Sequence, residues 1–157
     1  MTVLNPYLTF PGNCEEAFNF YKSVFGGEFA SIGRFSEMPP QEGMTVSDED
    51  KNKIMHVSLP ISKEATIMGC DDWGSRTAYG NNIGLSLSTD SKEEADRLFE
   101  KLTQGGKATM PMGKTFWGSY FGMCTDRYNI NWMISIDERQ ANETSDQEHT
   151  MRAETMA

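Results

Sequence analysis

His56 and Cys70 lie in neighbouring segments whose residues alternate between apolar and polar types. A turn over residues 62–64 would join these segments as a β-hairpin, in the register that makes one face wholly apolar. The pairs are then Val57 with Gly69 and Leu59 with Ile67 on the apolar face, and His56 with Cys70 and Ser58 with Met68 on the other. A partly polar sheet face that no helix covers is a candidate ligand-binding surface.

His56 is the only histidine outside residues 137–157, and three roles are open for it. In the first, the ring is partly buried and bonded to a backbone carbonyl or a polar neighbour, as most such rings are. In the second, it orients a bound ligand or acts as a general base, since histidine titrates near neutral pH. In the third, His56 acts with Cys70 as a metal pair or as a base and nucleophile. His56 is therefore the candidate catalytic residue.

A nucleophilic cysteine and a cluster of aspartates are two further possibilities to consider. The acidic neighbours Asp71 and Asp72 argue against a nucleophilic role for Cys70, which we expect to behave as a small hydrophobic residue. Together with Asp126 they resemble a hard-cation cluster, but aspartates at strand ends usually belong to turns. The sequence contains no phosphate-binding glycine loop and no G-x-S-x-G nucleophile elbow.

Residues 116–121 form a run rich in aromatic side chains, Phe-Trp-Gly-Ser-Tyr-Phe. Such a run is typical of a sheet core or a dimer contact, or of a stacking wall for a flat or apolar ligand. The methionines are compatible with both, because Met lines adaptable pockets and also fills irregular cores. Trp117 and Met133 are therefore candidate ligand-binding residues.

The 157 residues carry 23 acidic and 14 basic side chains, a formal net charge of −9. This balance argues against nucleic acid, which proteins bind largely through lysine and arginine. Three cysteines without a C-x-x-C pair disfavour a disulfide framework and a structural zinc site, and we expect a cytoplasmic protein. The apolar runs are too short for a membrane span, and we expect no signal peptide.

The stretch 137–157 differs in composition from the rest of the chain. It holds six acidic and two basic residues and no Leu, Ile, Val, Phe, Tyr or Trp. Such a segment buries too little apolar surface to offset the entropy of ordering it. We predict an acidic flexible tail over 137–157.

Two parts of the chain repeat the same order of predicted elements. A strand over 7–10 precedes a helix that begins at Asn13, in a capping box with Glu16, and ends at the glycines 26–27. The second part has an alternating strand over 83–87, a helix capped by Asp90 or Ser91, and a stop at the glycines 105–106. The spacing indicates an internal repeat of long period.

After each helix the alternation returns to a period of two and predicts three strands. These lie near 28–35, 54–61 and 65–71 in the first part and near 107–113, 117–125 and 130–136 in the second. The fold class is therefore α+β, with two paired βαβββ modules forming a rolled mixed sheet around a groove. We predict a single domain over 1–136, with modules at about 3–72 and 80–136.

A set of spaced segments carries a family resemblance over about residues 3–136. They are 5–10, 16–21, 25–27, 53–56, Trp117, 121–122, Asp126 and 132–134. Together they resemble the PhnB-like branch of the vicinal oxygen chelate (VOC) superfamily, which includes glyoxalase I, bleomycin-resistance proteins and extradiol dioxygenases. Asn129 stands where relatives usually have glycine, and asparagine tolerates the left-handed turn expected there.

The resemblance implies a divalent metal held in the groove by His, Glu or Gln on the first and last strands of each module. The corresponding positions here are Asn5 (Pro6 with a shifted gap), Met68, Asn82 and Met133. Amide oxygens are weak ligands, and thioethers suit soft Cu(I) better than the metals of such enzymes. We therefore expect no glyoxalase-type metal centre and no cofactor. With Tyr7, the residues Met68, Asn82 and Met133 become candidates for ligand binding.

These observations favour a protein that binds a small molecule in the sheet groove. The alternative is a VOC enzyme of the lyase, isomerase or dioxygenase kind, with an atypical metal set or a step assisted by His56. A third possibility is a protein whose main role is its interface, since we expect a homodimer that covers the open sheet edges. Some PhnB-like relatives are labelled as methyltransferases, but this chain lacks the glycine-rich turn that would hold a nucleotide-bearing methyl donor.

Overall fold

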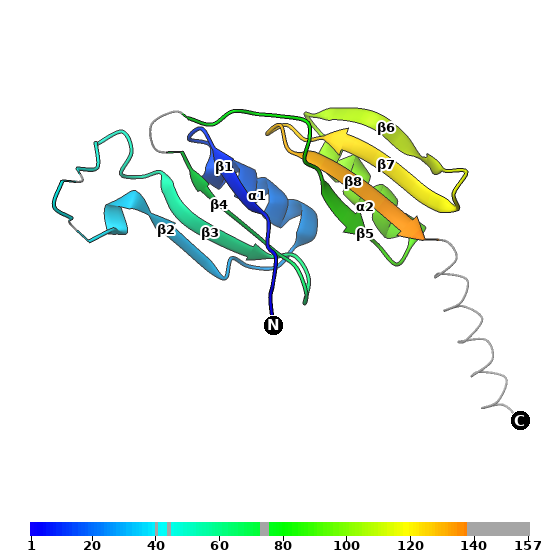
Figure 1. Ribbon diagram of the computed structural model, residues 1–157, viewed down its shortest axis with the longest axis horizontal. Coiled ribbons are helices and arrows are strands. Elements are labelled where there is room, and N and C mark those ends of the chain that lie inside the picture. The colour runs from blue at the N-terminus through cyan, green and yellow to red at the C-terminus, as the bar shows by residue number, and fades with distance from the viewer. Residues whose placement is uncertain (40, 44, 73–75, 138–157) are drawn as a thin grey trace, which may run out of the picture. The chain divides into compact units, whose positions relative to one another are not determined.

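The computed structural model describes residues 1–39, 41–43, 45–72 and 76–137. The chain divides into two compact units, Met1–Tyr79 and Gly80–Ala157, here called the first and the second unit. Within the described residues, each unit holds one four-stranded sheet and one α-helix (Figure 1). No helix among these residues has the length and apolar character needed to cross a membrane.

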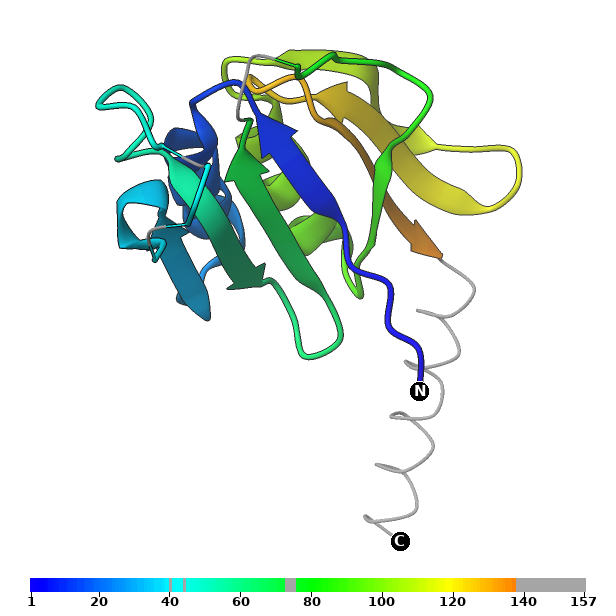
Figure 2. The ribbon, with the colours of Figure 1, turned by 60° about the vertical axis from the view of Figure 1, so that its left-hand side comes forward.

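The first unit has the element order strand, helix and three strands. Its elements are β1 (Tyr7–Phe10), α1 (Cys14–Phe25), β2 (Ser31–Arg34), a 3-10 turn η1 (Phe35–Glu37), β3 (Ile54–Pro60) and β4 (Thr66–Asp71). The sheet order is β1-β4-β3-β2, with β1 parallel to β4 and the other neighbours antiparallel. Helix α1 packs against β3 and β4 (Figure 2). The core of the first unit includes the side chains of Phe10, Phe18, Tyr21, Val57, Leu59 and Ile67.

The second unit repeats this topology. Its elements are β5 (Leu85–Ser88), α2 (Lys92–Thr103), β6 (Lys107–Lys114), β7 (Ser119–Thr125) and β8 (Asn131–Asp137). The sheet order β5-β8-β7-β6 corresponds strand for strand to that of the first unit, and β5 is parallel to β8. The predicted α+β class is confirmed. Strand β8 reaches Asp137, the first residue of the predicted tail, and the rest of that prediction lies outside the described residues.

The predicted register of the hairpin between β3 and β4 is confirmed, with Val57 opposite Gly69 and Ser58 opposite Met68. A Cβ on Gly69 would lie 2.7 Å from a ring carbon of Phe18, so only glycine allows α1 to approach β4 this closely. Strict alternation along the predicted strand 54–61 places Ile54 on the same face as His56 and Ser58, and this expectation is wrong. A register shift between β2 and β3 leaves one extra residue on β3, and Ile54 lies fully buried.

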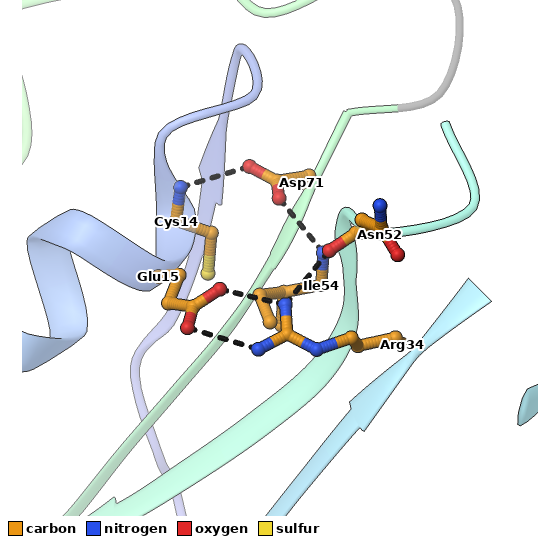
Figure 3. Close-up of polar contacts among 6 residues, drawn as sticks. All are labelled: Cys14, Glu15, Arg34, Asn52, Ile54 and Asp71. Carbon is orange, nitrogen blue, oxygen red and sulfur yellow. Dashed lines mark hydrogen bonds and ion pairs between the residues drawn. The ribbon is translucent and has the colours of Figure 1, made fainter. Parts of the chain in front are cut away.

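The two helices begin differently. Ser91 caps α2 as predicted, its side chain accepting a bond from the Glu94 backbone N–H at 3.2 Å. The capping box predicted for α1 is wrong, because Asn13 makes no side-chain cap bond in the described structure. Asp71 of β4 replaces it and accepts from the Cys14 backbone N–H at 2.9 Å (Figure 3). A carboxylate suits this place, since helix N-termini favour negative charge.

Asn129 adopts the left-handed conformation expected for it, with φ at 65° in the turn between β7 and β8. Its backbone N–H donates to the Asp126 carbonyl at 3.0 Å, which closes the turn. Asparagine thus serves where glycine would otherwise be favoured.

Candidate functional site

The first sheet presents its open face on the side away from α1. We name it the Tyr7 face, after the residues that alternate with the buried core positions: Tyr7, Thr9, His56, Ser58, Met68 and Cys70. Cross-strand pairing brings them together, since β4 lies between β1 and β3 and pairs Tyr7 with Met68, Thr9 with Cys70 and Ser58 with Met68. All six are half-buried or exposed, so the face is accessible.

Tyr7 and His56 meet above the central strand β4. The Tyr7 hydroxyl lies 3.4 Å from Nδ1 of His56, and the two ring centroids are 5.9 Å apart. When Nδ1 carries no proton, the phenol can donate to it; when Nδ1 is protonated, the phenol oxygen can accept. This contact leaves both rings at the surface as a pair of flat, hydrogen-bonding groups.

Cys70 interacts with Thr9 and Tyr7 on this face. Its Sγ is 4.0 Å from Oγ1 of Thr9. Partial burial of Tyr7, and after it the hydrogen bond between Tyr7 and Cys70, raises the pKa of Tyr7 to about 12. Tyr7 therefore remains a neutral phenol, able to donate a hydrogen bond, throughout the physiological range.

Asp71, directly after Cys70, fixes the elements that carry these side chains (Figure 3). One oxygen of the buried carboxylate accepts from the Cys14 N–H at 2.9 Å, and the other accepts from the Ile54 N–H at 2.8 Å. This carboxylate thus ties the end of β4 to the starts of α1 and β3. Burial, with the charge of Asp71 as the next cause, raises the pKa of the Cys14 thiol.

An ion pair on the same side of the first unit ties β2 to α1. Arg34 donates to the two carboxylate oxygens of Glu15 at 2.6 and 2.9 Å, and to the Asn52 carbonyl at 2.8 Å (Figure 3). The bidentate geometry holds the guanidinium in one orientation. The hydrogen bond from Arg34 lowers the pKa of Glu15.

The second sheet carries a different open face. On β7 and β8 the residues that alternate with the core are Phe121, Met123 and Met133, and all three are half-buried. Trp117 precedes β7 and is 49% exposed, with its ring 6.1 Å from that of Phe121. A Cβ on Gly84 would lie 3.4 Å from the methyl carbon of Met133. Aromatic and thioether groups, which suit apolar ligands, therefore line this face.

The structure brings together part of the predicted site. Five predicted residues share the Tyr7 face of the first unit: Tyr7, His56, Ser58, Met68 and Cys70. Trp117 and Met133 belong to the second unit, where Asn82 lies exposed in the segment before β5. Sequence reasoning did not select Thr9, although it follows Tyr7 by two positions on one strand, the spacing that puts both on one face.

The donor set does not fit the divalent metal of the superfamily. The four corresponding positions offer amide and thioether groups, which are poor ligands for hard and borderline divalent ions. Among residues 1–39, 41–43, 45–72 and 76–137, no three His, Cys, Asp or Glu side chains come together as a metal site. Asp71 bonds to backbone N–H groups, as does Asp126, which accepts from Tyr128 and Ile130.

Comparison with known proteins gives consistent matches over most of the chain. Residues 2–135 match the model of the family described as 3-demethylubiquinone-9 3-methyltransferase. Protein YjdN of Escherichia coli K12 is 33% identical over 146 residues, covering 87% of this chain and 97% of that protein. The crystal structure of protein PA1353 from Pseudomonas aeruginosa is 37% identical, with a TM-score of 0.77, covering 87% and 98% of the two chains.

Two further structures connect the sequence family to a fold. A putative 3-demethylubiquinone-9 3-methyltransferase, PhnB protein, from Bacillus cereus is 27% identical with a TM-score of 0.69, covering 86% and 99% of the two chains. A glyoxylase/bleomycin resistance protein/dioxygenase domain from Frankia sp. EAN1pec is 17% identical with a TM-score of 0.62, covering 87% and 98%, and shows the fold alone. The chain therefore belongs to the PhnB-like family, described as 3-demethylubiquinone-9 3-methyltransferase, and has the fold of the VOC superfamily.

Proposed function

We propose that this PhnB-like protein binds a small molecule on the Tyr7 face of the first sheet, without a glyoxalase-type metal centre or another cofactor. The observation that carries the proposal is the meeting of the Tyr7 hydroxyl and His56 Nδ1 at 3.4 Å above β4, on the face away from α1. Convergent polar groups on an accessible, partly apolar surface are what small-molecule sites require.

The side chains on the Tyr7 face determine which chemical groups a matching ligand must carry. Tyr7 supplies a neutral hydroxyl donor, because its pKa is raised to about 12 by burial and then by Cys70. His56 supplies a ring nitrogen, and Met68 supplies an adaptable apolar contact beside Ser58. A flat molecule with at least one hydrogen-bond acceptor matches this set. Within the second unit, taken by itself, Trp117, Met133 and Asn82 are proposed as ligand-binding residues.

The alternative function is an acid–base step in which His56 acts as the catalytic residue. The same contact favours it, because a phenol beside an imidazole can pass a proton through the ring. No step through a metal is included, since the donor set does not fit one. A reaction of this kind would leave binding intact in Tyr7→Phe and abolish turnover in His56→Ala.

Native mass spectrometry after incubation with a pool of small phenols and aromatic carboxylates tests the binding proposal. Tyr7→Phe removes the donor, His56→Ala removes the ring, and Lys63→Ala, in the exposed turn between β3 and β4, is the matched control. We expect adducts with the parent protein and with Lys63→Ala, weakened about tenfold in the other two, the loss of about 1.4 kcal/mol. Equal adducts in all four proteins would contradict the proposal, and a stoichiometric divalent metal by elemental analysis would overturn the part that excludes a glyoxalase-type centre.

Two broader features also belong to the proposal. Each sheet has two edge strands within its own unit, and we propose a homodimer that covers part of them. Sedimentation that shows only monomer at micromolar concentration would overturn the homodimer.

We propose the cytoplasm as location because all three cysteines are unpaired, as in a reducing compartment. Thiol counting on protein from freshly lysed cells would contradict this if any cysteine were oxidised.

A further inference from the structure

Three methionines form a row across the second sheet. Met110 of β6 lies directly opposite Met123 of β7, and Met123 lies directly opposite Met133 of β8. Residues that face each other across antiparallel strands point to the same side of the sheet. The three methionines are therefore neighbouring residues on one face of the sheet.

This row lies on the face away from α2. The neighbours of Met123 and Met133 along their strands are buried: Gly122, Cys124, Trp132 and Ile134. Met110 is 44% exposed, and Met123 and Met133 are half-buried, so all three residues are partly open to solvent.

A bulge in β6 singles out Met110 from its neighbour Met112. The register shifts on both sides of Met110, between Ala108 and Met110 and between Met110 and Gly113, and each shift adds one residue to β6. Met112 is turned toward Gly122, where a Cβ would lie 3.1 Å from its Cγ, and so belongs to the other face. The row thus has three members.

The spacing allows the three sulfur atoms to approach a common point. Neighbouring strands lie about 4.8 Å apart, which leaves the outer two Cα positions about 10 Å from each other. The methyl carbon of Met133 lies 3.4 Å from where a Cβ on Gly84 would be, next to β5, so this side chain must rotate to reach Met123. The three rotatable bonds of methionine allow such a rotation. We infer that changes of side-chain rotamer can bring the three sulfur atoms together.

We propose that Met110, Met123 and Met133 form a binding site for a soft monovalent metal ion, with Cu(I) and its redox-inert analogue Ag(I) as the ligands. Thioethers are soft donors that select Cu(I) over hard divalent ions. The ion remains monovalent and no bond is broken, so binding needs no oxidant or reductant beyond what keeps copper as Cu(I). The net charge of −9 favours a cation near the protein. This proposal uses no residue of the Tyr7 face, and it shares only Met133 with the ligand-binding residues proposed above.

Neutral sulfur ligands give this site a property that distinguishes it from one built on Cys70 or His56. A thioether has no proton to lose, whereas thiol and imidazole ligands must be deprotonated to bind metal. The affinity for Cu(I) at the methionine row is therefore constant between pH 5.5 and 7.5. A site that used a thiol or an imidazole would lose affinity over the same interval.

The test uses the full chain carrying Cys70→Ser, which removes the half-buried thiol. Anaerobic titration with Cu(I), against a chromogenic chelator calibrated at each pH, measures affinity and stoichiometry. Met123→Leu is the main variant and Met55→Leu, beside Gly33 in the first unit, is the matched control. Leucine nearly conserves methionine's volume, so both variants keep the fold, as circular dichroism will verify.

We expect one bound equivalent, unchanged affinity at the two pH values, and at least a tenfold loss in Met123→Leu but not in Met55→Leu. With Ag(I) and methyl-labelled methionine, the resonances of Met110, Met123 and Met133 will shift together. Unchanged affinity in Met123→Leu, a steep loss at pH 5.5, or shifts confined to other methionines would each overturn the proposal.

Discussion

The two sheets of this protein have the same strand order and the same helix placement, but their open faces differ in chemistry. The first presents a phenol, an imidazole and a thiol within reach of one another, from Tyr7, His56 and Cys70. The second presents a row of thioethers and aromatic rings. Core positions under a helix must pack, whereas positions on an open face are freer to vary. The repeat therefore keeps the architecture, while the side-chain chemistry of the open face differs between the two units.

The buried aspartates show a second difference between the units. Asp71 joins three separate elements, because its bonds reach the starts of both α1 and β3. Asp126 organises one turn, accepting from Tyr128 and Ile130 and also from the indole N–H of Trp132 at 2.8 Å. One carboxylate supports the site of the first unit, and the other supports the hairpin of the second.

The largest expected effect comes from removing these carboxylates. Asp71→Ala and Asp126→Ala each leave buried N–H donors without a partner, which we expect to lower the free energy of unfolding by about 3 kcal/mol or more. Urea unfolding measures the loss. Amide chemical shifts should change across α1, β3 and β4 in the first variant and near the β7–β8 turn in the second. A loss in the free energy of unfolding below about 1 kcal/mol in either variant would contradict the structural role given to that carboxylate.

Thiol reactivity separates the open face from the two cores. Cys14 and Cys124 are buried, and burial raises the pKa of Cys124 to about 11, whereas Cys70 is only half-buried. At pH 8 we expect Cys70 to react with an aromatic disulfide at least about 100-fold faster than the other two. Cys70→Ser should remove the fast phase. Three similar rates, or a fast phase that survives this substitution, would contradict the described burial.

The two tyrosines sharpen the contrast through pH. The pKa of Tyr7 is raised to about 12 mainly by burial, and that of Tyr120 to about 12 mainly by its hydrogen bond to Asp96, at 2.5 Å. Folding favours the protonated phenols, so their contribution to stability is complete below about pH 10 and is lost as the pH rises toward 12. In ultraviolet titrations, Asp96→Asn should lower the pKa of Tyr120 and leave that of Tyr7 unchanged. A fall in the pKa values of both Tyr120 and Tyr7 in this variant would contradict the separate causes given for the two shifts.

The smallest effect concerns ion pairs. Glu15→Gln breaks the bidentate pair with Arg34 between α1 and β2, and Glu94→Gln breaks the pair with Arg97 within α2. Both are substantially exposed, so we expect losses of about 0.2–1 kcal/mol, the larger in Glu15→Gln. Arg34 lowers the pKa of Glu15, so this stabilisation is present above about pH 4.3 and is lost as the pH falls through the lowered pKa. Urea midpoints at pH 7 and pH 3 measure both effects, and equal losses at the two pH values would contradict the assignment.

Sequence patterns predicted the order of elements, the hairpin register and a cap for α2 at Asp90 or Ser91, because alternation and capping are local signals. They could not predict the burial of Ile54 or the face on which Met110 lies. Both depend on β-bulges, which change the side-chain alternation and which no residue type in these segments predicts. Nor could they show that Asp71 would cap α1, because that bond joins residues 57 positions apart. The partners on the Tyr7 face were predictable in outline, and the contact between Tyr7 and His56 was not.

The most direct test of the Tyr7 face is a two-dimensional NMR titration with the phenol and aromatic carboxylate pool, followed at the His56 ring protons and the methionine methyl groups. We predict that the ring protons of His56 and the amides of Tyr7 and Cys70 shift together and saturate with one affinity. The same titration of Tyr7→Phe should require about tenfold more ligand. Ring protons of His56 that do not move while the ligand binds elsewhere, or an unchanged affinity in Tyr7→Phe, would contradict the account.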